Sequence, residues 1–113
     1  MAITTIVYPV RDLAGATAVF SAFLGVPPTT DTPYYVGFSL DGQEVGLDPH
    51  GFDHGMTGPI NYVDVDDAAK AVARLVEAGA TELSGPRDVG GGKLVATVAD
   101  ADGNVLGLVQ PPS

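Results

Sequence analysis

The chain has 113 residues, of which 45% are hydrophobic and 17% are charged, as is typical of one small soluble globular domain. Its formal net charge of −9 and its five dispersed basic residues argue against binding to nucleic acid or to an anionic membrane surface. The absence of cysteine excludes disulfide bonds, thiolate metal ligands and a cysteine nucleophile.

The first twelve residues, MAITTIVYPVRD, lack the basic segment and the long apolar segment of a secretory signal. No uninterrupted apolar run approaches the length of a membrane span, about 18 residues. We therefore expect a cytoplasmic protein that does not enter a membrane.

The sequence contains an internal tandem repeat. Ile6–Gly25 and Asn61–Ala80 each run from a β-rich stretch through Val-x-Asp into an alanine-rich stretch. Further along, Leu40–Leu47 matches Ala101–Leu108. Because the similar segments keep their order, we interpret the chain as a duplication of roughly 55 to 60 residues.

Each copy is expected to contain one helix, near residues 13–24 and 67–78. Asp12 in the first copy, and Asp66 or Asp67 in the second, are suitable N-caps because a short carboxylate accepts from the free amides of the first turn. Gly25 and Gly79 are typical residues at helix C-termini.

Each helix is followed by a short extended piece, PPTTDT or TELSG, and then by a hairpin. Asp41-Gly42 and Asp102-Gly103 are the turn dipeptides, each between two strand-forming runs. The fold class is therefore α+β, with two tandem βαβββ modules. Residues 1–53 form module one, with a linker at about 49–58, residues 59–113 form module two, and both belong to one structural domain.

The closing hairpin carries the most specific resemblance to a known family. Asp100 to Leu108 reads DADGNVLGL, which resembles the pattern D-P-D-G-N-x-x-E-L of the vicinal-oxygen-chelate superfamily. This superfamily groups glyoxalase I, extradiol dioxygenases, fosfomycin-resistance enzymes and bleomycin-resistance proteins, and the resemblance covers essentially the whole chain. It implies that the curved mixed sheets form a cup that binds substrate, and that two chains form a homodimer.

The resemblance also implies four metal-ligand positions, on the first and last strands of each module. Metal-using members commonly carry His, Gln or Glu there, whereas this chain has Thr5, Gly46, Ile60 and Gly107. Glycine has no side chain, isoleucine has no lone pair, and a neutral threonine hydroxyl is a weak ligand. We therefore expect a metal-free branch of the family with no cofactor.

Both histidines lie between the modules, in LDPHGFDHGMTG. His50 and His54 are four residues apart, as metal ligands on a helix are, with Asp48 two residues before His50 and Asp53 directly before His54. Pro49 and several glycines oppose a helix here. A solvated linker is favoured, with two alternatives: a mobile lid carrying Phe52, His54 and Met56, or a replacement metal site.

Strand alternation gives candidate pocket residues on the same face as the four metal positions. Tyr34, Val36 and Phe38 share one face of their strand, opposite Tyr35 and Gly37, and the pattern leaves open which face points inward. The two glycines at metal positions could deepen a cavity for a flat ligand. The candidate ligand pocket comprises Thr5, Val7, Tyr34, Val36, Phe38, Gly46, Asp48, Phe52, His54, Met56, Ile60, Tyr62, Gly107 and Val109.

These observations favour metal-independent binding of a small hydrophobic or aromatic molecule in the cup. The role would be sequestration or drug resistance of the bleomycin-resistance type. The alternative is a glyoxalase- or dioxygenase-like enzyme, a lyase or isomerase, with an unusual metal site or a non-standard acid/base group. Its candidate acid/base groups are Glu44, Asp48, Tyr62 and the linker histidines. A scaffold without ligand function is the third possibility, and no catalytic residue is assigned.

Overall fold

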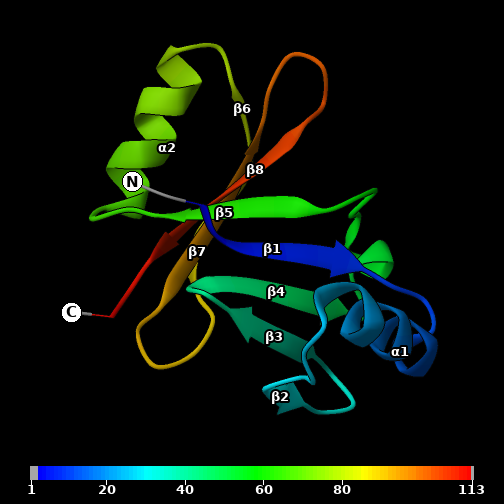
Figure 1. The fold of residues 1–113 in the computed structure, drawn as a ribbon. Helices are drawn as coiled ribbons and strands as arrows, with labels where there is room; N and C mark the ends of the chain where they lie inside the picture. Colours follow the sequence, from blue (N-terminus) through cyan, green and yellow to red (C-terminus); the bar gives the residue numbers. More distant parts are fainter. Residues whose placement is uncertain (1–2, 113) are drawn as a thin grey trace. The chain divides into compact units, whose positions relative to one another are not determined.

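The computed structural model describes residues 3–112. These residues divide into an N-terminal unit, residues 4–60, and a C-terminal unit, Ile3 with residues 61–112. The elements follow the chain as shown in Figure 1: β1 (Ile3–Pro9), α1 (Leu13–Leu24), β2 (Thr30–Asp31), β3 (Val36–Leu40), β4 (Gln43–Asp48), η1 (Phe52–His54), β5 (Ile60–Asp64), α2 (Ala68–Glu77), β6 (Thr81–Asp88), β7 (Leu94–Ala99) and β8 (Val105–Gln110).

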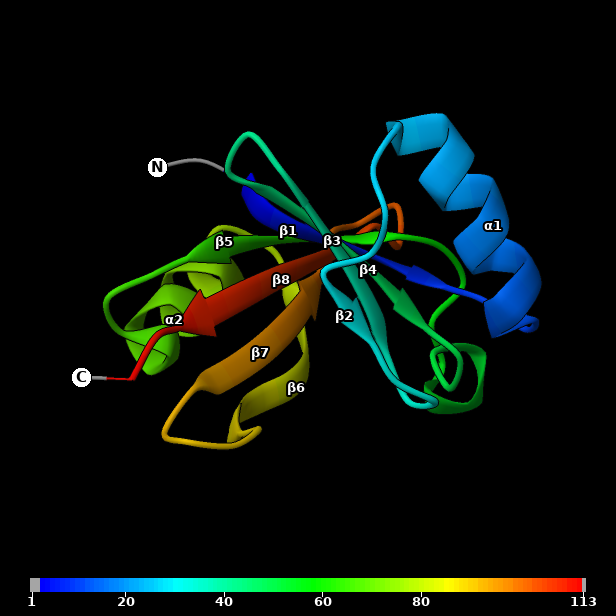
Figure 2. The ribbon, with the colours of Figure 1, turned by 60° about the horizontal axis from the view of Figure 1, so that its bottom comes forward.

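Both units have the same strand topology. In the N-terminal unit the strand order is β2-β3-β4-β1, and β1 is parallel to β4 while the other pairs are antiparallel. In the C-terminal unit the order is β5-β8-β7-β6, and β5 is likewise parallel to β8. Figure 2 shows β8, β7 and β6 in succession. The predicted α+β fold with two βαβββ modules is confirmed, and the cup expected from them stays a prediction.

The helices begin where the carboxylate caps predict. Asp12 accepts a hydrogen bond from the backbone N–H of Gly15 at 3.1 Å, and Asp67 accepts one from Lys70 at the same distance. The second cap is therefore Asp67 and not Asp66. Gly25 closes α1 with φ at +76°, a conformation that glycine adopts without strain. Neither helix of residues 3–112 has the length and apolar character of a membrane span.

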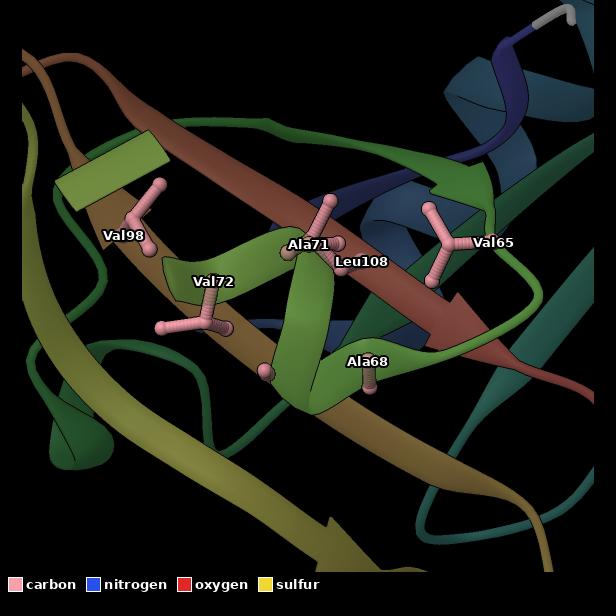
Figure 3. Close-up of a cluster of buried hydrophobic side chains, with 7 residues drawn as sticks. Val65, Ala68, Ala71, Val72, Val98 and Leu108 are labelled. Carbon is pink, nitrogen blue, oxygen red and sulfur yellow. The ribbon is translucent and has the colours of Figure 1, made fainter. Parts of the chain in front are cut away.

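Each helix covers one face of the sheet in its own unit. Under α1 lie Val36, Phe38, Val45 and Leu47, all buried, and the α1 residues Leu13, Phe20 and Leu24 pack against them. Under α2 a second core joins Ala68, Ala71 and Val72 to Ala96, Val98 and Leu108 (Figure 3). Because side chains alternate along a strand, every second strand residue points to the face without a helix.

The hairpin of the C-terminal unit is held by one aspartate. The Asp100 carboxylate accepts hydrogen bonds from the backbone N–H of Asp102 at 2.9 Å and of Asn104 at 2.8 Å, and from Asn104 Nδ2 at 2.8 Å. The side-chain hydrogen bond from Asn104 is the main cause that lowers the pKa of Asp100. Asp102-Gly103 therefore lies in the predicted turn, and Asp100, two residues before this dipeptide, stabilises that turn.

We predict that Phe38→Ala destabilises the protein by about 3 to 5 kcal/mol, the usual cost of emptying a large aromatic site in a core. The Phe38 side chain is 0% exposed, whereas Phe23 on α1 is 76% exposed. Phe23→Ala is the matched control and should change the free energy of unfolding by no more than about 0.5 kcal/mol. Urea unfolding measures both variants, and equal losses would contradict this assignment of the core.

Candidate ligand-binding site

Each unit has a candidate site on its helix-free face, meaning the face of its strands that its own helix leaves uncovered. In the N-terminal unit a row of neighbours crosses four strands through Val7, Gly46, Gly37 and Thr30. Two consecutive members of this row are glycines, so the sheet there lacks side chains of its own. The empty strip is available to a side chain from elsewhere.

Tyr35 fills that strip. A Cβ atom added to Gly46 would lie 2.6 Å from Tyr35 Cζ, and one added to Gly37 would lie 3.2 Å from Tyr35 Cε2. Both separations are shorter than normal van der Waals contact. The tyrosine ring therefore lies over both glycines, and a side chain at Gly46 would displace it.

The C-terminal unit repeats this arrangement with a different tyrosine. Gly107 pairs with Tyr62 on β5 and with Thr97 on β7. A Cβ atom added to Gly107 would lie 2.7 Å from Tyr62 Cγ, so the ring lies over this glycine. Gly46 and Gly107 are two of the positions at which the family resemblance implies a metal ligand, and an aromatic ring covers each of them.

This geometry changes the interpretation of the glycines. A deeper cavity was one interpretation of the sequence, but the space above the glycines is occupied by Tyr35 and Tyr62. Glycine in a strand loses packing, and an aromatic neighbour placed over it restores part of that packing. Each tyrosine is half-buried, so part of each side chain remains accessible to solvent.

Val36 and Phe38 lie away from the candidate site, which corrects their assignment to the pocket. Both point toward α1 and are 1% and 0% exposed, so a ligand on the helix-free face cannot touch them. Tyr34 precedes β3 and is 74% exposed. The alternating pattern correctly placed Val36 and Phe38 on one strand face. Only the packing of α1 decided that this face is the buried one.

The remaining candidates are spread over the two units. Ile60 and Val109 are buried, while Thr5 and Val7 are half-buried. Asp48 is also half-buried, and its carboxylate accepts a hydrogen bond from the backbone N–H of His50 at 2.8 Å. Asp48 therefore stabilises the start of the linker. Glu44 is exposed.

The linker is folded onto its own unit. Phe52 begins the short 3-10 helix η1, and the Arg11 guanidinium carbon lies 4.1 Å from the centre of its ring. Gly51 is buried between Pro9 and Met56, where a Cβ atom would lie 2.7 Å from Pro9 Cβ. Phe52 and Met56 therefore pack near the end of β1, and His54 is exposed.

The residues at the family's metal positions do not suit a metal ion. Thr5, Gly46, Ile60 and Gly107 offer one neutral hydroxyl between them, and rings cover both glycines. In the linker, His50 Nδ1 lies 3.6 Å from Asp53 Oδ2, and both side chains are exposed. Across residues 3–112 no three His, Cys, Asp or Glu side chains gather as metal ligands would.

Sequence reasoning did not select Tyr35, Thr30 or Thr97, which border the glycines. A signal for Tyr35 was present, because Tyr35 and Gly37 are two apart and must share a strand face. A glycine in a strand interior favours close approach of another group. No local signal identified the cross-strand neighbours Thr30 and Thr97, because pairing register depends on the whole sheet.

We predict that Gly46→Ala and Gly107→Ala each displace the covering tyrosine and destabilise the protein by about 1 to 3 kcal/mol through overpacking. The chain has no tryptophan, so its near-ultraviolet circular dichroism reports mainly on tyrosine and should change in both variants. Gly58→Ala is the control, because a Cβ atom there meets nothing within 4 Å. An unchanged tyrosine signal in the two strand variants would disprove the ring placement.

Comparison with known proteins identifies the family. The sequence model described as the Glyoxalase/Bleomycin resistance protein/Dioxygenase superfamily matches residues 2–108. No curated protein sequence matches the chain.

Solved structures show the same fold. A glyoxalase/bleomycin resistance protein/dioxygenase superfamily member from Vibrio splendidus superposes with a TM-score of 0.71 at 20% identity, covering 95% of this chain and 97% of the other. A hypothetical protein from Bacillus halodurans gives 0.75 at 12% identity, covering 99% and 95%. A Mn(II)-bound glyoxalase from Novosphingobium aromaticivorans gives 0.67 at 17% identity, covering 96% of this chain and 38% of that one. The family match over nearly the whole sequence confirms the expected resemblance, and this chain belongs to the glyoxalase/bleomycin resistance protein/dioxygenase superfamily.

Proposed function

We propose that this protein binds a small hydrophobic or aromatic organic molecule without a metal ion. Membership of the superfamily supports small-molecule binding or an enzymatic role in general. The finer proposal gives each unit its own ligand site, against the tyrosine of its helix-free face. Sequestration of a toxic compound, as in bleomycin-type resistance, is the role that this chemistry fits best.

The observation that carries the proposal is the pair of tyrosine rings over Gly46 and Gly107. A tyrosine ring that already packs on the backbone of a glycine loses little further conformational freedom when a ligand packs against the ring. Tyrosine also combines an apolar ring with a polar hydroxyl, a combination that is common in binding surfaces for organic molecules. Each module therefore presents an aromatic group at a position where the family resemblance implies a metal ligand.

Binding requires no reacting group. The candidate acid/base groups either make structural contacts or are exposed to solvent. The Asp48 carboxylate accepts from the linker backbone, and Glu44 is exposed. His50 lies 3.6 Å from Asp53 at the surface. These placements favour the binder over the enzyme alternative. From the family resemblance we also propose a cytoplasmic homodimer.

We predict that the purified protein retains well under one divalent metal ion per chain after dialysis. The four family positions supply no adequate ligand set, so added zinc or nickel should leave the melting temperature nearly unchanged, since only a ligand that binds the native state raises it. Elemental analysis and thermal unfolding measure the two quantities. One retained equivalent of metal that His50→Ala or His54→Ala releases would replace this proposal with a metalloenzyme.

We predict that 1-naphthol, a planar and mostly apolar probe, binds with the same affinity in the presence and absence of EDTA. Tyr35→Ala and Tyr62→Ala should each weaken binding at the site of their own unit by about fivefold, the loss expected for one aromatic contact. Titration calorimetry measures the affinities, and Tyr34→Ala serves as the control because that ring is 74% exposed. If Tyr34→Ala weakens binding as much as the other two, the ligand does not lie on the helix-free faces.

A further inference from the structure

A groove in the N-terminal unit lies on the opposite side of the sheet from the tyrosine-covered glycines. It has a volume of about 570 Å³ and separates α1 from the segment leading into β3. Val36 lies in its lining and shares a sheet face with Phe38, under α1. The groove is lined by Leu13, Ala14, Thr17, Asp31, Thr32, Pro33 and Val36.

The two threonine hydroxyls in this groove are already committed to the backbone. Thr32 Oγ1 accepts from the backbone N–H groups of Tyr34 at 3.2 Å and Tyr35 at 3.0 Å, and donates to the Tyr35 carbonyl at 2.9 Å. Thr17 donates to the Leu13 carbonyl at 2.7 Å. These bonds use every donor that the hydroxyls have, so neither can donate to a ligand without losing a structural bond.

Asp31 supplies the remaining polar group. Its carboxylate is the one charged group in the lining, and within residues 3–112 we find no ion pair or side-chain hydrogen bond that uses it. Residues 4–60 contain six carboxylates but a single basic residue, Arg11, which stacks on Phe52. An ionised carboxylate only accepts hydrogen bonds, so its partner has to be a donor, and the surrounding negative charge favours a cation.

We propose that this groove binds a small organic cation with an apolar body, such as an arylalkylamine. The apolar body packs between Leu13, Ala14 and Pro33, and the ammonium group pairs with Asp31. Anions of the same shape are repelled by the carboxylates of the unit. The site is separate from the proposed tyrosine site and does not depend on it.

We expect the groove to bind its ligand with low affinity. Its preference for a cation over a neutral analogue is the property that identifies the site. An ion pair at an exposed carboxylate contributes little, so we expect the cation to bind about threefold more tightly than a neutral analogue at low salt. Raising the ionic strength to about 1 M reduces the Debye length to about 3 Å and should remove most of this preference. Apolar contact with the groove supplies the rest of the affinity.

The test uses the full chain labelled with ¹⁵N and three probes of similar shape: 2-phenylethylammonium, 2-phenylethanol and 3-phenylpropanoate. Amide signals of Ala14 and Thr17 on α1 and of Asp31 and Thr32 should shift in the order cation, neutral, anion. Tyr62→Ala should leave these shifts unchanged. The absence of shifts at millimolar cation, or shifts confined to the surroundings of Gly46 or Gly107, would overturn the proposal.

Two variants and one control assign the effect to the groove. Asp31→Asn should abolish the preference for the cation over the neutral probe, and Ala14→Leu should weaken all three probes by filling the groove. Asp41→Asn removes the same charge from a distant hairpin of the same unit, at φ +50°, which asparagine tolerates. If Asp41→Asn reduces the preference as much as Asp31→Asn, the effect is general electrostatics and the proposed site is wrong.

Discussion

Burial of one sheet face beneath a single helix is the constraint on which each module depends. The N-terminal core rests on Phe38, Leu47 and Val36 under α1, and the C-terminal core rests on Val98, Ala96 and Ala68 around α2. Side chains alternate along a strand. When one set of residues is buried in the core, the other set therefore points to the helix-free face. The chemistry of that second set is then free to vary while the core is kept.

Gly46 and Gly107, where the family resemblance implies metal ligands, belong to this second set. A metal site needs several lone-pair donors held on rigid strands, and glycine removes the donor together with the side chain. The vacated volume in each module is taken by a tyrosine, but the two rings have different origins. Tyr35 precedes β3 and covers two glycines, whereas Tyr62 belongs to β5 and covers its direct neighbour across the parallel pair. Similar aromatic surfaces therefore arise from different positions in the duplicated sequence.

The two helices have diverged more than the sheets that they cover. α1 has no charged residue, and its Val19 and Phe23 are 65% and 76% exposed. α2 carries Lys70, Arg74 and Glu77 on its exposed side. The groove beside α1 is accordingly apolar with one carboxylate, while a groove beside α2 is lined by Asp66, Asp67, Lys70 and Arg74, which carry both signs of charge. Selectivity for a cation is therefore expected of the N-terminal module alone.

The amino-acid sequence by itself determined the duplication, both helices and both hairpins, because these depend on local chemistry. Asp12 and Asp67 begin the helices through hydrogen bonds three residues along the chain, and the Asp-Gly turns need only a left-handed backbone. Tertiary structure alone decided which strand face is buried. Alternation groups Val36 with Phe38 and Tyr35 with Gly37, but packing of a helix distant in sequence chooses between the groups. The candidate site followed from that choice, since only the cross-strand register brings Tyr35 over Gly46 and Tyr62 over Gly107.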